Sequence, residues 1–195
     1  MVMEVNMFEN FTENAMRVMF GASLEALRLR HDSIKPEHIF LGVIFEKTND
    51  ATKELESNGV TTKNALEEIE KMIGRGNDSW SAGKRVYPNP AAIEVLELAH
   101  NKAKECRSGE ISPSHIFLAL INEKEIQKIL ENLGIDETKL NEIQSLLLGR
   151  MTFLDFSDTS REELSEWDWD SIHEHIAELK SEDTVEEALN KWLSS

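Results

Sequence analysis

The chain is poor in several features that would each point to a particular class of protein. It has one cysteine, Cys106, so no disulfide can form within the chain and a reducing compartment is the default. No apolar run reaches the roughly 18 residues of a membrane-spanning helix. Residues 1–6 lack the basic and apolar regions of a signal peptide. We therefore predict a cytoplasmic protein.

Basic residues are also scarce. Lysine and arginine total 21 against 37 aspartates and glutamates, which gives a net charge of -16. Binding to a phosphate backbone or to an anionic membrane needs basic surface, so we predict that the protein binds neither nucleic acid nor membranes. The charge is uneven, because residues 151–195 contain 13 acidic and three basic residues and hold -10 of the total. This change in composition predicts a boundary near residue 150.

An internal repeat organises residues 1–150. The stretch SIKPEHIFLGVIFEK at 33–47 returns as EISPSHIFLALINEK at 110–124, which is 77 residues later. The same offset holds upstream, where small apolar residues at helical spacing coincide: Ala15, Val18, Ala22 and Ala26 match Ala92, Val95, Ala99 and Ala103. The match predicts two copies of one unit, at about 7–75 and 89–150, joined by an exposed linker at 76–88.

Each copy has the pattern of four helices. The apolar positions between residues 12 and 30 are spaced by three and four, and Thr12 suits the N-cap of that helix. Pro36 suits the first turn of a second helix, while Gly59 and Gly74 are typical of helix ends. No stretch of the first 150 residues alternates as a strand does. We predict an all-α fold, a tandem repeat of two four-helix units with a short helical acidic C-terminal extension at 151–195.

Two segments carry a resemblance to a known family. Residues 7–18, MFENFTENAMRV, resemble the opening of the N-terminal domain of Clp-type AAA+ unfoldases, the Clp C branch in particular, which reads M-F-x-x-F-T-E-x-A-x-x-V. Residues 36–42, PEHIFLG, resemble the family segment T-E-H-I-L-L-G, and residues 113–118, PSHIFL, resemble its second copy. The resemblance covers about 7–150. It implies a tandem of two four-helix repeats that receives adaptor proteins and substrates.

The same resemblance implies candidate binding residues. In Clp C-type members each repeat resembles a receptor for phosphorylated arginine that uses a threonine at the first helix and the glutamate of T-E-H. Thr12 and Glu37 keep this pair in the first copy, and a carboxylate can accept paired hydrogen bonds from a guanidinium group. Ser114 replaces the glutamate in the second copy. Glu37 is equally well explained as a carboxylate that stabilises the N-terminus of its own helix.

Catalytic and metal-binding patterns are missing from the sequence. The unfoldase motor needs the phosphate-binding loop G-x-x-x-x-G-K-[ST], which the nearest stretch, at 78–85, does not match. His173 and His175 lack the spacing of an H-E-x-x-H zinc site. We expect His38 and His115 to stabilise helix junctions instead, and Cys106 to fill a small core position. The expected protein is a stand-alone Clp N-domain that is not an enzyme and binds no metal or cofactor.

Tryptophans provide the other candidate binding residues. Trp80 lies in the linker, and Trp167 and Trp169 lie in the acidic extension, where capping-box patterns predict two short helices. The extension either packs back on the repeat domain or presents its tryptophans to a basic partner, and Trp80 either anchors a partner or folds back.

The leading functional hypothesis is a non-enzymatic protein–protein interaction module of a Clp ATPase–protease system. Its partners would be adaptors, substrates, or Clp ATPase or protease subunits. The alternative is a structural accessory subunit that docks on a protease core or another complex without recognising substrates.

Overall fold

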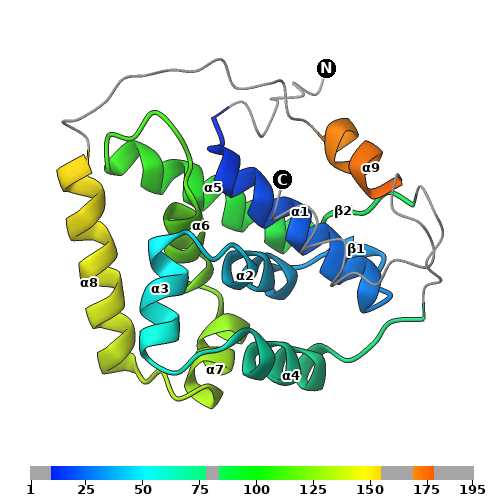
Figure 1. Cartoon of the computed structure of the whole chain (residues 1–195), viewed down its shortest axis with the longest axis horizontal. Coiled ribbons are helices and arrows are strands. Elements are labelled where there is room, and N and C mark those ends of the chain that lie inside the picture. The colour runs from blue at the N-terminus through cyan, green and yellow to red at the C-terminus, as the bar shows by residue number, and fades with distance from the viewer. Residues whose placement is uncertain (1–9, 78–83, 155–168, 178–195) are drawn as a thin grey trace.

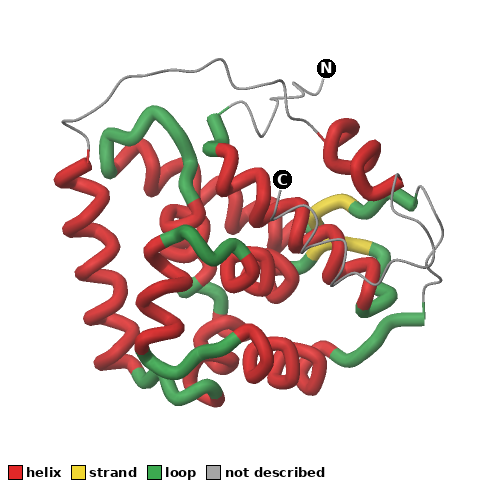
Figure 2. The backbone as a smooth tube through the Cα atoms, in the orientation of Figure 1, coloured by secondary structure: helices red, strands yellow, loops and turns green. Residues whose placement is uncertain are grey.

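The computed structural model describes residues 10–77, 84–154 and 169–177, and their backbone is mostly helical (Figure 2). The first predicted copy contains α1 (Glu13–Arg28), α2 (Pro36–Phe45), α3 (Asp50–Ser57) and α4 (Thr62–Ile73). The second contains α5 (Pro90–Glu105), α6 (Pro113–Leu120), α7 (Lys124–Asn132) and α8 (Glu137–Leu154). α9 (Trp169–Ala177) lies in the extension, and two short strands are β1 (Ser33–Ile34) and β2 (Tyr87–Pro88). The predicted all-α class is confirmed.

The first helix of each copy begins in the same way. α1 and α5 are both 16 residues long. The side chain of Thr12 accepts the backbone N–H of Ala15 at 3.2 Å, and that of Asn89 accepts the N–H of Ala92 at 2.8 Å. Such caps satisfy amide groups that have no partner inside the helix. Thr12 is therefore the N-cap that the sequence predicts.

The segments that precede these two helices each pair with the other copy. The N–H of Thr12 donates to the carbonyl oxygen of Ile111 at 3.0 Å, and the N–H of Asn89 donates to that of Ile34 at 2.9 Å. The two contacts are related by the same offset of 77 residues. β1 and β2 extend the second contact as a parallel pair. Neither strand is predicted from the sequence, since two residues are too few to show an alternating pattern.

Histidines close the N-terminal turns of α2 and α6. Nδ1 of His38 accepts the N–H of Lys35 at 2.9 Å, and Nδ1 of His115 accepts the N–H of Ser112 at 3.0 Å. Both rings are buried. The predicted role of these histidines at helix junctions is confirmed.

α2 and α6 lie near the centre of the molecule, with α8 and α9 at opposite margins (Figure 1). The rings of Phe40 and Phe117, which are equivalent in the two copies, have centroids 6.5 Å apart and join these helices across the core. α2 also approaches α1 so closely that a Cβ atom at Gly42 would lie 2.1 Å from the carbonyl oxygen of Val18. Cys106 is buried at the end of α5, as predicted.

Two segment boundaries differ from the sequence prediction. α8 continues through residue 150 to Leu154, so the predicted boundary near residue 150 lies inside a helix. The linker at 76–88 is not exposed throughout, because Val86 is fully buried and a Cβ atom at Gly76 would lie 2.1 Å from the carbonyl oxygen of Arg30. The second helix predicted for the extension lies outside the described residues.

Candidate protein-binding surfaces

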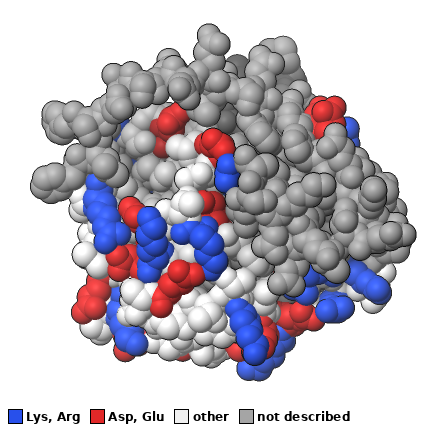
Figure 3. Space-filling view, in the orientation of Figure 1, with Lys and Arg blue, Asp and Glu red and all other residues white. Residues whose placement is uncertain are grey.

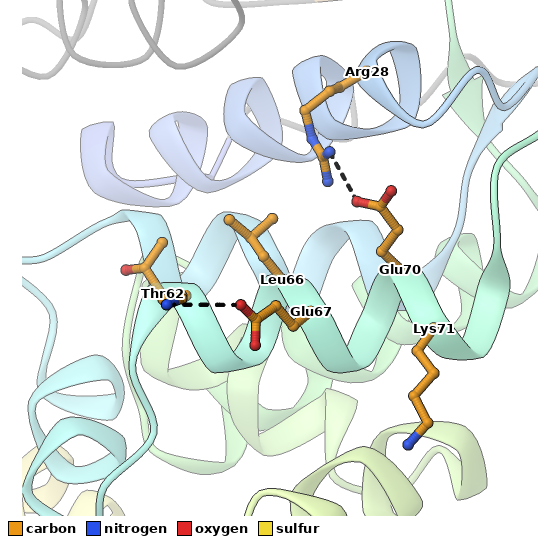
Figure 4. A pocket seen from close by; sticks show the side chains of 7 residues that line it. Arg28, Thr62, Leu66, Glu67, Glu70 and Lys71 are labelled. Carbon is orange, nitrogen blue, oxygen red and sulfur yellow. Dashed lines mark hydrogen bonds and ion pairs between the residues drawn. The ribbon is translucent and has the colours of Figure 1, made fainter.

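An open groove of about 770 Å³ lies between α1 and α4. One residue of α1 and six of α4 line it: Arg28, Thr62, Lys63, Leu66, Glu67, Glu70 and Lys71. In Figure 4, Leu66 points toward α1 and Arg28 crosses from α1 toward Glu70. The groove thus has an apolar base and a rim with charges of both signs. Basic and acidic side chains also stand beside one another over the lower part of the face seen in Figure 3.

Arg28 joins the two walls of this groove. Its Nε lies 2.9 Å from Oε2 of Glu25 on α1, and its Nη1 lies 3.1 Å from Oε2 of Glu70 on α4. Burial raises the pKa of Glu25, and the charge of Arg28 opposes this effect. Hydrogen bonds from Arg75 and Arg28 lower the pKa of Glu70, which stays ionised. These ion pairs fix the charged rim around Leu66.

A second, smaller hollow of about 250 Å³ opens where α1, α3 and α6 begin. It is lined from both copies, by Thr12, Asn14, Thr48, Asn49, Asp50, Ser112, Pro113, Ser114, Leu147, Arg150 and Met151. The hydroxyl of Thr12 accepts an amide as the N-cap and donates to the carbonyl oxygen of Ile111 at 3.3 Å. Arg150 reaches from α8 to α3, 2.6 Å from Glu54 and 3.7 Å from Asp50. The hydroxyl and the guanidinium group at this hollow are therefore already engaged.

Glu37 is not among the residues that line the hollow at Thr12. It is only 7% exposed, and Oε2 is buried with no hydrogen-bond partner among the described residues. Burial raises the pKa of Glu37, its own N–H and Lys35 oppose this, and Glu125 of α7 adds to it. Ser114, the equivalent of Glu37, is the residue that lines the hollow beside Thr12. Each of the two residues thus lies near the other copy, Thr12 beside Ile111 and Ser114, and Glu37 within electrostatic reach of Glu125.

The tryptophan candidates are only partly visible. Trp80 and Trp167 lie outside the described residues, and so does the side chain of Trp169, although its backbone begins α9. Binding by these three residues stays a prediction.

α9 packs against the start of the second copy, beside β2 (Figure 1). Ile172 is buried, and Nε2 of His173 lies 3.3 Å from the carbonyl oxygen of Val86. Asp170 accepts a hydrogen bond from Nη1 of Arg85 at 2.6 Å. This part of the extension therefore packs back on the repeat domain, which is one of the two arrangements left open by the sequence.

Among residues 10–77, 84–154 and 169–177, no group of three or more His, Cys, Asp or Glu side chains is arranged to hold a metal ion. No helix in these same ranges is long and apolar enough to cross a membrane.

Sequence reasoning missed the groove between α1 and α4. In the sequence, Leu66 is one member of an apolar stripe with Ile69, Met72 and Ile73, and no motif includes Arg28. The only local signal is that Leu66 stands at the edge of the stripe, next to Glu67 and one turn from Glu70. The ion pair between Arg28 and Glu70 spans the groove. It joins residues that are 42 positions apart in the chain, a separation that helical periodicity does not reveal.

Two helical units that pair their leading segments crosswise, with a groove on the outer side of one of them, define a tandem-repeat helical domain. The chain belongs to the family described as the Clp repeat (R) N-terminal domain, which matches residues 10–133 and 94–155. The predicted resemblance to Clp N-terminal domains is confirmed.

Curated relatives agree with this family. The chain is 38% identical over 157 residues to an ATP-dependent Clp protease ATP-binding subunit ClpA homolog of Cyanidium caldarium, covering 80% of this chain and 18% of that protein. It is 41% identical over 136 residues to the chloroplastic chaperone protein ClpC of Pisum sativum, covering 69% and 14%. The chain thus spans less than a fifth of the length of these relatives.

Solved structures share the fold. The N-terminal domain of ClpD from Arabidopsis thaliana superposes with a TM-score of 0.63 at 24% identity, covering 74% of this chain and 96% of that one. The ClpV N-domain in complex with a VipB peptide gives a TM-score of 0.55 at 15% identity, covering 73% and 89%. The fold implied by the sequence resemblance is therefore that of the Clp N-domain.

Proposed function

We propose that this protein is a non-enzymatic protein-binding module of a Clp ATPase–protease system, which binds adaptors, substrates or Clp subunits. The observation that carries the proposal is the groove between α1 and α4. It offers a partly exposed apolar side chain, Leu66, inside a frame of charged residues. This is the arrangement of a protein interface, where an apolar centre is surrounded by a polar rim.

The size and order of the groove suit a segment of a partner protein. The groove is open to solvent along α4 and has a volume of about 770 Å³. Arg28 is already held by Glu25 and Glu70 in the unbound protein. Because these side chains are ordered in advance, binding costs little further conformational entropy.

The relatives support the Clp context of this proposal. They are named as Clp ATP-binding subunits and Clp chaperones, and the ClpV N-domain has been solved with a VipB peptide. We extend to this chain the general property of binding a protein segment. The identity of its own partner follows from the experiment below.

We assign this binding to the groove rather than to a pair formed by Thr12 and Glu37. A receptor for phosphorylated arginine would need the hydroxyl and the carboxylate to reach one ligand, and Glu37 is not among the residues that line the hollow at Thr12. The hollow at Thr12 is lined by Ser114, the equivalent of Glu37 in the second copy, so it lacks the carboxylate of that position. Thr12 and Glu37 therefore stay separate candidate binding residues, and neither lines the groove.

We place the protein in a reducing compartment. Its single cysteine is buried, and the cytoplasmic assignment drawn from the sequence agrees with such an environment. The relative from Pisum sativum is named as chloroplastic. Fractionation of native cells with an antibody to this protein distinguishes the two compartments.

The function is tested by comparing two leucine-to-glutamate variants. Leu66→Glu places a charge in the groove, whereas Leu146→Glu makes the same change at a 48% exposed residue of α8. Each purified protein is titrated with unfolded casein, a Clp ATPase and a Clp protease core. We expect Leu66→Glu to weaken binding to the casein or the ATPase about tenfold, a loss of about 1.4 kcal/mol. Leu146→Glu should bind like the wild type.

Other results of this experiment would overturn the proposal. Equal binding by the two variants would show that the groove is not the site. Binding to the protease core alone would favour the alternative of an accessory subunit that does not recognise substrates. Circular dichroism of each variant establishes that a loss of binding does not reflect unfolding.

A further inference from the structure

α9 is a short helix that is held by one face. Ile172 and Ile176, one turn apart, are at most 1% exposed, and His173 between them is 4% exposed. Glu174 on the same helix is exposed. A helix of nine residues is marginal on its own in water, so the helical form of α9 depends on the surface beneath it.

Residues 85–87 form the part of that surface for which individual contacts are resolved, and we call them the β2 surface. Arg85 donates to Asp170, the carbonyl oxygen of Val86 lies within hydrogen-bonding distance of His173, and the Tyr87 ring meets the His173 ring edge-on. The centroids of these two rings are 5.2 Å apart. Val86 itself is fully buried. The surface thus offers a cation, a carbonyl acceptor and an aromatic ring.

We propose that the β2 surface is a binding site for an acidic amphipathic helix of a partner protein, and that α9 is its internal competitor. α9 defines the chemistry of this partner. The partner helix carries an acidic residue where Asp170 meets Arg85 and aliphatic residues at the positions of Ile172 and Ile176. Proteins that bind a helix in an apolar groove recognise it in the same way, through apolar side chains spaced by one helical turn.

The contacts of α9 suit a competitor that can be displaced. The ion pair between Arg85 and Asp170 is about half exposed or more at both ends, and such pairs contribute little to stability. The hydrogen bond of His173 is long, at 3.3 Å. A covalent tether gives α9 a high local concentration, so only a partner with additional contacts displaces it. The site is separate from the α1–α4 groove, so either proposal can fail without the other.

The test uses a labelled peptide with the sequence of residues 169–177, capped at both ends. It is titrated into the wild-type protein and into the double variant Ile172→Asp/Ile176→Asp, which releases α9 from the surface. We expect the double variant to bind the peptide at least tenfold more tightly, because its site is vacant. Equal binding by the two proteins would overturn the proposal, provided that circular dichroism shows the double variant folded.

A charge swap tests the same site without altering the core. Arg85→Glu, added to the double variant, should weaken binding of the peptide several-fold. A peptide carrying Asp170→Arg should restore binding to this triple variant. Glu174→Gln is the matched control on the exposed face of α9 and should bind the peptide as weakly as the wild type does. Failure of the swapped peptide to recover binding would contradict the assignment of Arg85.

Hydrogen exchange provides an independent measurement on the intact protein. We expect the amides of α9 to exchange faster than those of α1, and faster still in the full-length variant Asp170→Arg. If α9 is protected as strongly as α1 in both proteins, α9 is a fixed part of the fold and the proposal is wrong.

Discussion

His38 should make the stability of this protein sensitive to mild acid. Its Nδ1 accepts the N–H of Lys35, so its proton is on Nε2, which lies 2.8 Å from Nδ1 of His31. A second proton on the ring would break one of these hydrogen bonds. Burial is the main cause that lowers the pKa of His38, with help from the charges of His31 and Lys35, to about 3.

The size of the effect follows from proton linkage. In the unfolded chain His38 binds a proton as the pH falls below about 6.5, whereas in the folded chain it does so only when the pH falls to about 3. Stability is therefore complete above pH 6.5 and falls as the pH drops through this window. The expected loss from this residue is about 2 kcal/mol between pH 7 and pH 5, and about 4 kcal/mol between pH 7 and pH 3.

The variant His38→Asn isolates this contribution. The chain already uses asparagine for the same purpose, since Oδ1 of Asn64 accepts the N–H of Thr61 at 2.7 Å at the start of α4. Denaturant unfolding followed by circular dichroism gives the free energy of unfolding of both proteins at several pH values. We expect the wild type to lose about 2 kcal/mol more than the variant between pH 7 and pH 5. Parallel pH curves would refute the reasoning.

Three further predictions concern stability, each measured by denaturant unfolding. Gly42→Ala should destabilise the protein by about 1–3 kcal/mol, because the new Cβ atom would lie 2.1 Å from the carbonyl oxygen of Val18; a neutral result would show that α1 and α2 can separate freely. Gly149→Ala should instead stabilise by about 0.5–1 kcal/mol, because Gly149 lies inside α8 and no atom of the described residues lies within 4 Å of the added Cβ atom; a loss of stability would contradict these open surroundings. Thr12→Ala should cost about 1 kcal/mol through the lost N-cap while Thr12→Ser costs less, and equal losses would argue against the cap.

Features that depend on short stretches of chain could be predicted from the sequence. The cap at Thr12, the proline in the first turn of α2 and the helix ends near Gly59 and Gly74 all appear in the structure. Each follows from the conformational preference of one residue type at a helix end. The buried position of Cys106 could be predicted because it matches an inward position in the other copy.

Features that depend on contacts between distant segments could not be predicted. The backbone pairing of Thr12 with Ile111 joins residues 99 positions apart and leaves no trace in helical periodicity. Docking of α9 on Val86 also depends on tertiary contact, since the apolar stripe of α9 shows only that the helix needs a partner.

The most direct test of the central claim is to map where a bound protein segment lies. Backbone amide NMR signals of the protein are followed while the unfolded protein or Clp subunit that binds it is added. We predict that the largest shifts occur at Thr62–Ile73 of α4 and at the Arg28 end of α1, the two walls of the groove. Binding that shifts only residues around Thr12 and Ser114, and leaves α4 unchanged, would contradict the account.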